Sequence, residues 1–306
     1  MSVKHFRSAK SLAPGARVAL IAPAGPLQKE DELPRAIENA RTFGWDPIVG
    51  QNAKKQLGYL AGDDHARLDD INRALQDPSI DALWCLRGGY GMIRILDGID
   101  YHALETNPKP IVGYSDITAL HAAVQRKCWL VSYHGPTARE ALTPFSRDSL
   151  QRAVVAQTDS CGTAGKARTL VGGKTEGRLA GGNLAVLTSL CGTAYAPDLN
   201  DCILILEDIN EPVYRIDRML QQLKLSGMLR GCKAIAFGEC VRCPDDAGGG
   251  GRSLDEVLRE IVGELRIPCV VGIPVGHIDE QWTIPLGAMA TLDAEACALN
   301  VTSYAS

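Results

Sequence analysis

Ser115 stands where a short apolar run turns into a helix, in the segment Pro110-Ile-Val-Gly-Tyr-Ser-Asp-Ile-Thr-Ala-Leu120. A polar side chain at such a corner projects from the carboxyl end of a sheet, where open α/β sheets place their sites. The amide of Asp116 then lies at a helix N-terminus, which favours a developing negative charge. Ser115 is therefore a candidate nucleophile, although Ile117 replaces the last glycine of a G-x-S-x-G turn. Taken alone, the segment favours a plain helix N-cap.

The run Arg87-Gly-Gly-Tyr-Gly91 also follows a buried apolar run. Glycines let a backbone approach a ligand closely or adopt positive φ, so this loop could supply a second N–H for an oxyanion beside Ser115. The alternative is a plain glycine turn. A phosphate-binding loop is disfavoured, because neither G-x-G-x-x-G nor a G-K-[ST] ending is present.

A serine nucleophile needs a base, which is normally a histidine held by a carboxylate. Among the six histidines, His134 follows a predicted strand, and His277 lies in a glycine-flanked loop after an apolar run. Residue type and spacing leave both open as the base. The other four are assigned to the surface or to a helix face that points away from Ser115: His5, His65, His102 and His121.

Glu207 ends the apolar run Leu204-Ile-Leu206, where a charge is costly unless it is paired, solvated or functional. Asp208 and Glu211 follow on the next turn, and all three acids could simply be solvated. Glu207 is nearest the strand, so it is the best candidate for the carboxylate that orients the base.

Cys240-Val-Arg-Cys243 has C-x-x-C spacing. It lacks a second pair or a histidine at the distance that zinc sites use, so the sequence predicts no metal site there. The ten cysteines otherwise sit singly in apolar segments, as reduced core thiols do.

The elements that must hold these residues alternate between strand and helix through the first half of the chain. Apolar runs predict buried parallel strands, and amphipathic runs between them predict helices on both faces of the sheet. The predicted strands are 17–22, 80–86, 111–112 and 129–133, and the predicted helices are 30–43, 63–76 and 117–126.

A polar stretch rich in small residues, without clear periodicity, separates this half from the next. It divides the chain into an N-terminal α/β domain (1–145), a linker (146–175) and a C-terminal domain (176–306). In the last of these, strands are expected at 202–206 and 233–237 and around Val270, Thr283 and Leu292, with a helix at 214–225. Gly248–Gly251 is expected to be a flexible loop, followed by a capping box at Ser253–Glu256.

Composition excludes several classes of protein. The chain has 306 residues, a formal net charge of −4, 45% hydrophobic and 22% charged residues. No basic run supports nucleic-acid binding, and no apolar run approaches the roughly 20 residues that span a bilayer. A cytoplasmic protein without a membrane partner is expected.

Together these segments resemble the LD-carboxypeptidases, which are serine peptidases of the muramoyltetrapeptide carboxypeptidase type. The resemblance covers nearly the whole chain. It rests on Val18–Pro23, Trp84–Gly91, Gly113–Asp116, His134–Pro136, Gly181–Asn183, Leu206–Asp208, Tyr214–Arg218 and Gly276–His277.

The resemblance implies a flavodoxin-like N-terminal domain and a mainly β C-terminal domain, with the site between them and often a homodimer. It implies Ser115 as nucleophile, His277 as general base and Glu207 as its partner, with the amides of Gly89 and Asp116 as the oxyanion hole. No metal or cofactor is implied. Because an exopeptidase must fix a free carboxylate, Arg87 and Asn183 are candidate substrate residues.

The implied reaction releases the terminal D-alanine of a murein tetrapeptide at an L–D bond during cell-wall recycling. One alternative is the self-immunity branch of the same family, which cleaves a peptidyl-nucleotide of the microcin C type. That branch needs an aromatic platform for the base, for which the sequence gives no clear sign. A third alternative is a binding protein without turnover, although a complete set of serine, histidine and glutamate argues against it.

Overall fold

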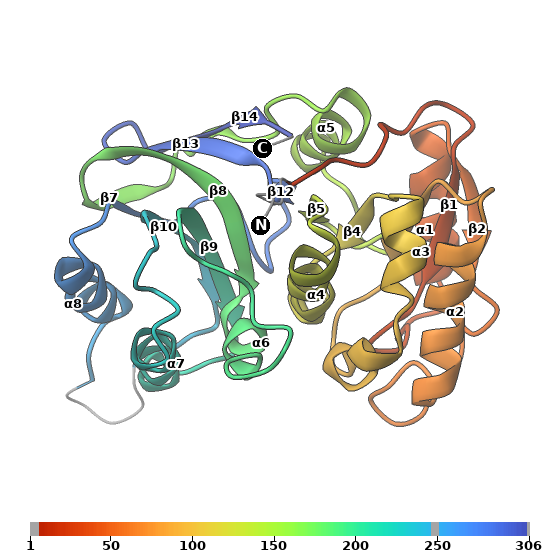
Figure 1. Ribbon diagram of the computed structural model, residues 1–306, viewed down its shortest axis with the longest axis horizontal. Helices are drawn as coiled ribbons and strands as arrows, with labels where there is room; N and C mark the ends of the chain where they lie inside the picture. The colour runs from red at the N-terminus through yellow and green to blue at the C-terminus, as the bar shows by residue number, and fades with distance from the viewer. Residues whose placement is uncertain (1–5, 246–250, 305–306) are drawn as a thin grey trace.

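The computed structural model describes residues 6–245 and 251–304. Two sheets lie side by side, with the N-terminal half at the right and the C-terminal half at the left of Figure 1. His5 and Gly248–Gly250 lie outside the described residues, so the predictions for them are not tested.

The first sheet has six strands in the order β12-β5-β4-β3-β1-β2. The five strands of the N-terminal half are parallel, as the alternation of strand and helix predicts. Together with the second sheet described below, they confirm the α/β fold class. β12 joins β5 antiparallel and comes from the far end of the chain. The bounds are β1 Arg17–Ile21, β2 Asp46–Val49, β3 Ala82–Cys85, β4 Ile111–Gly113, β5 Ser132–His134 and β12 Ile284–Leu286.

The helices of this half begin and end close to the residues that the sequence predicts. Asp63 caps α2, because its side chain accepts a hydrogen bond from the N–H of Ala66. The helical segments are α1 Glu32–Thr42, α2 Asp64–Gln76, η1 Met92–Gly98, α3 Tyr101–Thr106, η2 Ser115–Ile117 and α4 Thr118–Cys128.

The second sheet has eight strands in the order β6-β14-β13-β8-β9-β10-β11-β7. β8, β9, β10 and β11 are parallel to one another, and antiparallel strands flank them on both sides. The bounds are β6 Gly162–Thr163, β7 Arg168–Val171, β8 Lys174–Asn183, β9 Cys202–Ile209, β10 Ala234–Val241, β11 Cys269–Val271, β13 Met289–Asp293 and β14 Ala298–Ser303.

Helices α6 (Leu184–Ser189), α7 (Val213–Leu225) and α8 (Leu254–Leu265) lie along the lower and outer side of this sheet in Figure 1. The predicted capping box is confirmed: the Ser253 side chain bonds the Glu256 N–H, and the Glu256 side chain bonds the Ser253 N–H. No helix within the described ranges is long and apolar enough to cross a bilayer.

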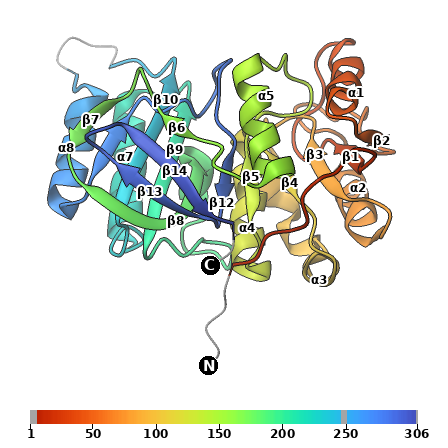
Figure 2. The same cartoon turned by 90° about the horizontal axis from the view of Figure 1, so that it is seen from above.

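Residues 146–175, for which the sequence predicts a linker, contain most of helix α5 (Pro144–Gln151), a helical turn over Arg152–Ala156 and strands β6 and β7. Figure 2 shows α5 above β5 and β12, at the junction of the two halves. The proposed domain boundaries remain a prediction, and these residues pack against both halves.

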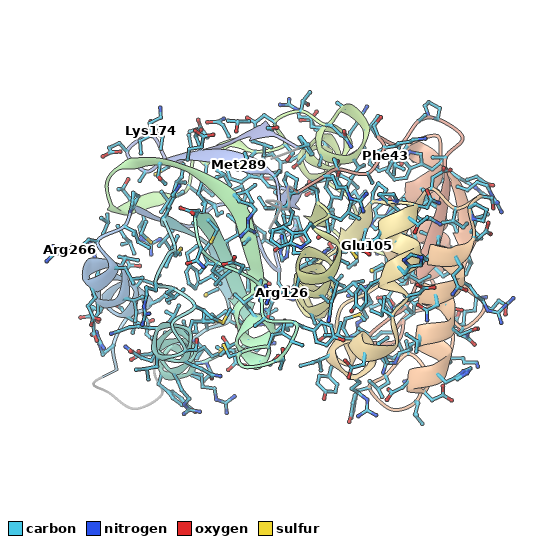
Figure 3. The ribbon with its side chains drawn as sticks, in the orientation of Figure 1. Phe43, Glu105, Arg126, Lys174, Arg266 and Met289 are labelled. Carbon is cyan, nitrogen blue, oxygen red and sulfur yellow. The ribbon has the colours of Figure 1, made fainter. Side chains whose placement is uncertain are left out.

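One hydrophobic cluster joins the two halves, because it contains Trp84 and Tyr133 from the first sheet together with Ile205 from the second. Side chains fill the space between the sheets in Figure 3, where Phe43 is labelled on the N-terminal half. The Phe43 ring stacks on the Trp45 ring, with the two ring centroids 4.6 Å apart. The shared core fixes how the end of β4 faces the end of β9, where the candidate site lies.

Candidate active site

Ser115 lies two residues after the end of β4, with φ +64°. Left-handed backbone is strained for a residue with a side chain, and such strain is typical of sharp strand-to-helix corners that carry a nucleophile. The cap of α4 is Ile117, which makes no side-chain cap bond. Ser115 Oγ forms its hydrogen bond with His277, so the helix-cap alternative has no hydrogen bond to support it among the described residues.

His277 lies in the loop between β11 and β12, and α5 holds that loop in place. Ser146 of α5 donates its hydroxyl hydrogen bond to the Asp279 carbonyl at 2.9 Å and accepts one from the Gln281 N–H at 2.9 Å. Gly276 precedes the histidine with φ +124°, and a Cβ there would lie 3.1 Å from Glu207 Oε2. The loop can approach the carboxylate this closely only with glycine at this position.

Three side chains from distant parts of the chain form a hydrogen-bonded row. His277 Nε2 lies 3.1 Å from Ser115 Oγ, and His277 Nδ1 lies 2.9 Å from Glu207 Oε2. A carboxylate can only accept, so Nδ1 donates to Glu207 and Nε2 accepts from the serine hydroxyl. This tautomer is the one that a histidine needs to remove a proton from serine.

Glu207 is fully buried near the end of β9, next to Asn183 of β8. Its neighbours Asp208 and Glu211 have other partners. Asp208 accepts hydrogen bonds from the Ala185 N–H and the Asn183 side chain, and burial raises its pKa to about 6. Glu211 forms an ion pair with Arg215. Of the three acids that the sequence singles out, Glu207 is the one that lies at His277.

The Arg87-Gly-Gly loop lies directly against the serine. A Cβ on Gly88 would lie 2.8 Å from Ser115 Cβ and 3.1 Å from its Oγ. Gly89 has φ +99° and packs on Gly25, while the Gly25 N–H donates to the Gly88 carbonyl at 2.7 Å. Neither the Gly89 N–H nor the Asp116 N–H has a backbone acceptor within residues 6–245 and 251–304. The role of these two amides as an oxyanion hole stays a prediction, with which their lack of a backbone acceptor is consistent.

Two buried charges clamp this loop. Asp116 Oδ2 accepts the Met92 N–H at 2.8 Å, and burial raises the pKa of Asp116 to about 6. Arg67, which is 1% exposed, donates to the Gly91 carbonyl at 2.9 Å and to the Pro23 carbonyl at 2.6 Å. The residue that follows Ser115 thus also anchors the loop that carries Gly89.

The other described histidines lie away from the serine hydroxyl. His134 is fully buried beside Tyr114, and burial lowers its pKa well below the ordinary value. His121 Nε2 lies 2.8 Å from the Gly113 carbonyl and is also buried. His65 and His102 are exposed, as the sequence predicts.

The two candidate substrate residues differ in their surroundings. Arg87 is partly buried and donates to the Pro26 carbonyl at 2.5 Å, and no carboxylate forms an ion pair with it among the described residues. Asn183 is 4% exposed. Its side chain caps α6 through the Val186 N–H and donates to Asp208. A substrate role for Asn183 stays a prediction, and its internal bonds favour a structural one.

Cys240 and Cys243 are free, partly buried thiols at the end of β10. Within the described residues, no group of three or more histidine, cysteine, aspartate or glutamate side chains is arranged to hold a metal ion.

Two residues that position the site, Arg67 and Ser146, are not predicted from the sequence. Arg67 lies on the buried face of α2 with Ala66, Asp70 and Ile71. An arginine on the face of a helix that packs against the core was the sign in the sequence that could have indicated its role. Ser146 lies within the predicted linker, and nothing in its local sequence indicates that it bonds loop residues 133 and 135 positions away.

Each half of the chain matches the model of one domain of a known family. The model of the LD-carboxypeptidase N-terminal domain matches residues 18–135, and the model of the C-terminal domain of that family matches residues 176–292. The murein tetrapeptide carboxypeptidase of Pseudomonas aeruginosa is 36% identical over 291 residues, which cover 90% of this chain and 93% of the relative.

Solved structures of LD-carboxypeptidase relatives have a fold similar to that of this chain. The muramoyltetrapeptide carboxypeptidase from Oxalobacter formigenes has a TM-score of 0.83 and 30% identity, over 94% of this chain and 98% of that one. The microcin C7 self-immunity protein MccF of Escherichia coli is 26% identical over 99% of this chain and 97% of the relative. Its complex with aspartyl sulfamoyl adenosine has a TM-score of 0.88 at 25% identity, over 97% of this chain and 98% of that one.

Proposed function

Because this chain belongs to the LD-carboxypeptidase family, we propose that it is a serine carboxypeptidase that releases the terminal D-alanine of murein tetrapeptides at an L–D bond. Membership of the family makes it a peptidase, within the hydrolases. The row Ser115–His277–Glu207 carries the proposal, since its spacings of 3.1 and 2.9 Å are those of a nucleophile, a base and an orienting carboxylate.

In the proposed mechanism, Ser115 Oγ attacks the scissile carbonyl while His277 Nε2 takes the hydroxyl proton. The carbonyl oxygen becomes negative and is stabilised by the N–H groups of Gly89 and Asp116. His277 then gives the proton to the amine of D-alanine, and the C–N bond breaks. The shortened peptide stays bound to Ser115 as an acyl ester. Water, deprotonated by His277, hydrolyses that ester and restores the serine.

Glu207 has two roles in this mechanism. It holds His277 in the tautomer that accepts from serine, and its charge stabilises the imidazolium that forms during attack. Arg87 supplies a cation for a substrate carboxylate close to the same loop. We also propose that the protein forms a homodimer, is cytoplasmic and acts in cell-wall recycling.

A second candidate is the self-immunity activity toward a peptidyl-nucleotide. It is favoured by the likeness to MccF and by an exposed aromatic pair, Tyr59 and Tyr90, beside the Arg87 loop. A non-catalytic binding protein is disfavoured, because the three side chains of the row are already aligned for proton transfer.

The test incubates the protein with UDP-MurNAc-tetrapeptide, with and without EDTA, and follows loss of one alanine by mass spectrometry. A parallel incubation uses an aminoacyl sulfamoyl adenosine. We expect alanine release that EDTA does not abolish. Cleavage of the nucleotide conjugate alone would favour the second candidate, and no release by folded protein at neutral pH would exclude the first.

A further inference from the structure

The Glu140 carboxylate receives hydrogen bonds from three segments of the chain, and the proposed mechanism does not use it. Glu140 lies in the loop between β5 and α5. The Thr137 hydroxyl of the same loop donates to its Oε1 at 2.9 Å, and the Gln281 side chain, from the loop that carries His277, donates to its Oε2 at 3.3 Å. The third donor is the hydroxyl of Tyr114, the residue before the proposed nucleophile. One carboxylate therefore joins the two segments that must meet in the active site.

The charge of Glu140 depends on these donors. Burial raises the pKa of its carboxyl, and the hydrogen bonds from Thr137 and Tyr114 oppose that shift. The neighbouring Arg139 forms its ion pair with Glu32 instead. Because a buried carboxylate is costly unless it is hydrogen-bonded, the carboxylate and its donors hold one another in place.

Tyr114 connects Glu140 to the imidazole of His277. Tyr114 is 8% exposed, and its ring centroid lies 4.9 Å from that of His277, at an interplanar angle of 59°. On another side, the same ring lies 6.0 Å from the ring of His134, at 70°. Tilted aromatic contacts at these separations are favourable. A phenol ring that is held at its hydroxyl and packed between two imidazoles restricts the rotation of the His277 ring.

Gln281 connects Glu140 to the backbone of the loop that carries His277. The side chain of Gln281 is fully buried and also lies 3.4 Å from the Ile278 carbonyl, to which it donates. Its own N–H donates to the Ser146 hydroxyl at 2.9 Å. The loop is therefore held through its backbone by Ser146 and through the Gln281 side chain by Glu140.

We propose that Glu140 is a positioning residue of the active site, which keeps His277 aligned with Ser115 by holding Tyr114 and Gln281. It does not touch the reacting atoms and acts through these two side chains. The proposal rests on the proposed peptidase function, because the alignment of His277 affects the rate only if His277 is the base. It gives the site a second carboxylate, whose role differs from that of Glu207.

The first experiment compares Glu140→Ala, which removes the acceptor, with Glu140→Gln, which keeps an acceptor oxygen in a side chain of the same shape. The readouts are kcat and KM for release of D-alanine from a murein tetrapeptide. We expect Glu140→Ala to lower kcat about 10- to 100-fold with KM nearly unchanged, because a displacement of about 1 Å at reacting groups can cost about 10². Glu140→Gln should restore kcat to within about fivefold of the wild type.

The second experiment measures the reactivity of Ser115 without a peptide, by its reaction with a fluorophosphonate. A bond forms between Ser115 Oγ and phosphorus, the bond from phosphorus to fluorine breaks, fluoride leaves, and His277 takes the hydroxyl proton. The gain in protein mass, followed over time, gives the rate constant. Misfolded protein would lower the labelled fraction and leave this rate constant unchanged. The rate constant should fall in Glu140→Ala by a factor similar to that for kcat, and Glu140→Gln should recover it.

Tyr114→Phe tests the connection through the phenol, because it keeps the ring and removes the hydroxyl. We expect both rates to fall about 3- to 10-fold. Glu140→Ala already lacks the hydrogen bond that Tyr114→Phe removes. Adding Tyr114→Phe to Glu140→Ala should therefore lower the rates by no more than about twofold further.

Two matched controls should leave both rates unchanged. Tyr133→Phe removes the hydroxyl of another buried tyrosine, in β5, which lies 3.5 Å from the Ser8 hydroxyl. Asp70→Ala removes another buried carboxyl whose pKa is raised by burial, and Asp70 is bonded by Asn52 of the N-terminal half.

The outcomes separate this proposal from the proposed function. It is overturned if Glu140→Ala keeps both rates within about threefold of the wild type, if Glu140→Gln loses as much as Glu140→Ala, or if KM alone rises. Labelling of Ser115 in a wild type that releases no D-alanine would refute the peptidase function on this substrate, and the labelling rates of the variants would still decide the role of Glu140. Neither labelling nor release by folded wild type would refute both.

Discussion

The Nε2 atom of His277 lies 3.1 Å from Ser115 Oγ, although the two residues are 162 positions apart and belong to different halves of the chain. The corner after β4 presents the serine, and the loop after β11 presents the histidine. Neither segment can do this alone, because the shared core and the pairing of β12 with β5 fix the distance. The proposed chemistry is therefore a property of the junction between the two sheets.

The choice of base can be tested by replacing the two candidate histidines, His134 and His277, one at a time. His277→Ala should lower kcat by at least about 10³, because it removes the acceptor of the serine proton. His134→Gln should keep kcat within about tenfold, since His134 makes no hydrogen bond to Ser115. Steady-state kinetics on folded variants checks this, and the reverse pattern would transfer the role of base to His134.

Glu207→Gln tests the orienting carboxylate. The variant keeps the shape of the side chain, but its amide can present an N–H to His277 and so stabilise the wrong tautomer. We expect kcat to fall on the order of 10³- to 10⁴-fold, with KM nearly unchanged. Asp208→Asn is the comparison, because Asp208 lies one residue further along β9 and bonds α6 instead. If Asp208→Asn lost more activity than Glu207→Gln, the assignment of Glu207 would be wrong.

Gly88→Ala tests the close approach of the loop to the serine. Its Cβ would lie 2.8 Å from Ser115 Cβ and 3.0 Å from the Tyr114 carbonyl, so the loop must move away. A displacement of about 1 Å at reacting groups can cost about 10² in kcat/KM, and we expect a loss of that order. The matched control is Gly263→Ala in α8, where nothing lies within 4 Å. The control should keep full activity and gain roughly 0.5–1 kcal/mol of stability. Full activity in Gly88→Ala would show that the loop does not need this contact.

Asp116 should make the stability of the protein depend on pH. Burial raises its pKa to about 6 from an ordinary value of 3.8, so between about pH 4 and 6 the folded state holds more protons than the unfolded state. The free energy of unfolding therefore falls as pH rises through this window. Asp116→Asn cannot ionise, so the wild type should lose about 2 kcal/mol relative to this variant between pH 4.5 and pH 7.

Denaturant unfolding of the wild type and of Asp116→Asn at the two pH values measures this difference. Parallel changes in the two proteins would mean that the carboxyl group titrates normally. Comparison at each pH cancels the contributions of the other titrating groups, which both proteins share.

The sequence predicts the N-terminal sheet well, because its strands are continuous apolar runs and its helices have clear amphipathic stripes. The corner at Ser115 and the buried position of Glu207 follow from the same patterns. β2 is missed, since Asp46–Val49 is a short edge strand with a partly exposed pattern. The short strands β6 and β7 are missed because their polar, small residues gain order only by pairing with β14 and β11.

Only part of the candidate site can be predicted from local sequence. Spacing in the sequence does not choose between His134 and His277 as the base. What distinguishes them is their distance from Ser115, which depends on how the two sheets pack. The family resemblance selects His277, and the geometry agrees with that selection. The clamp made by Arg67 depends on two carbonyl groups that come from the loops after β1 and β3, so no pattern in one segment encodes it.

The most direct test of Ser115 as the nucleophile compares release of D-alanine from a murein tetrapeptide by the wild type and by Ser115→Ala at equal concentrations of folded protein. We expect the variant to lose at least about 10³ in kcat while circular dichroism and thermal unfolding stay unchanged. Release by Ser115→Ala within tenfold of the wild-type rate would contradict it.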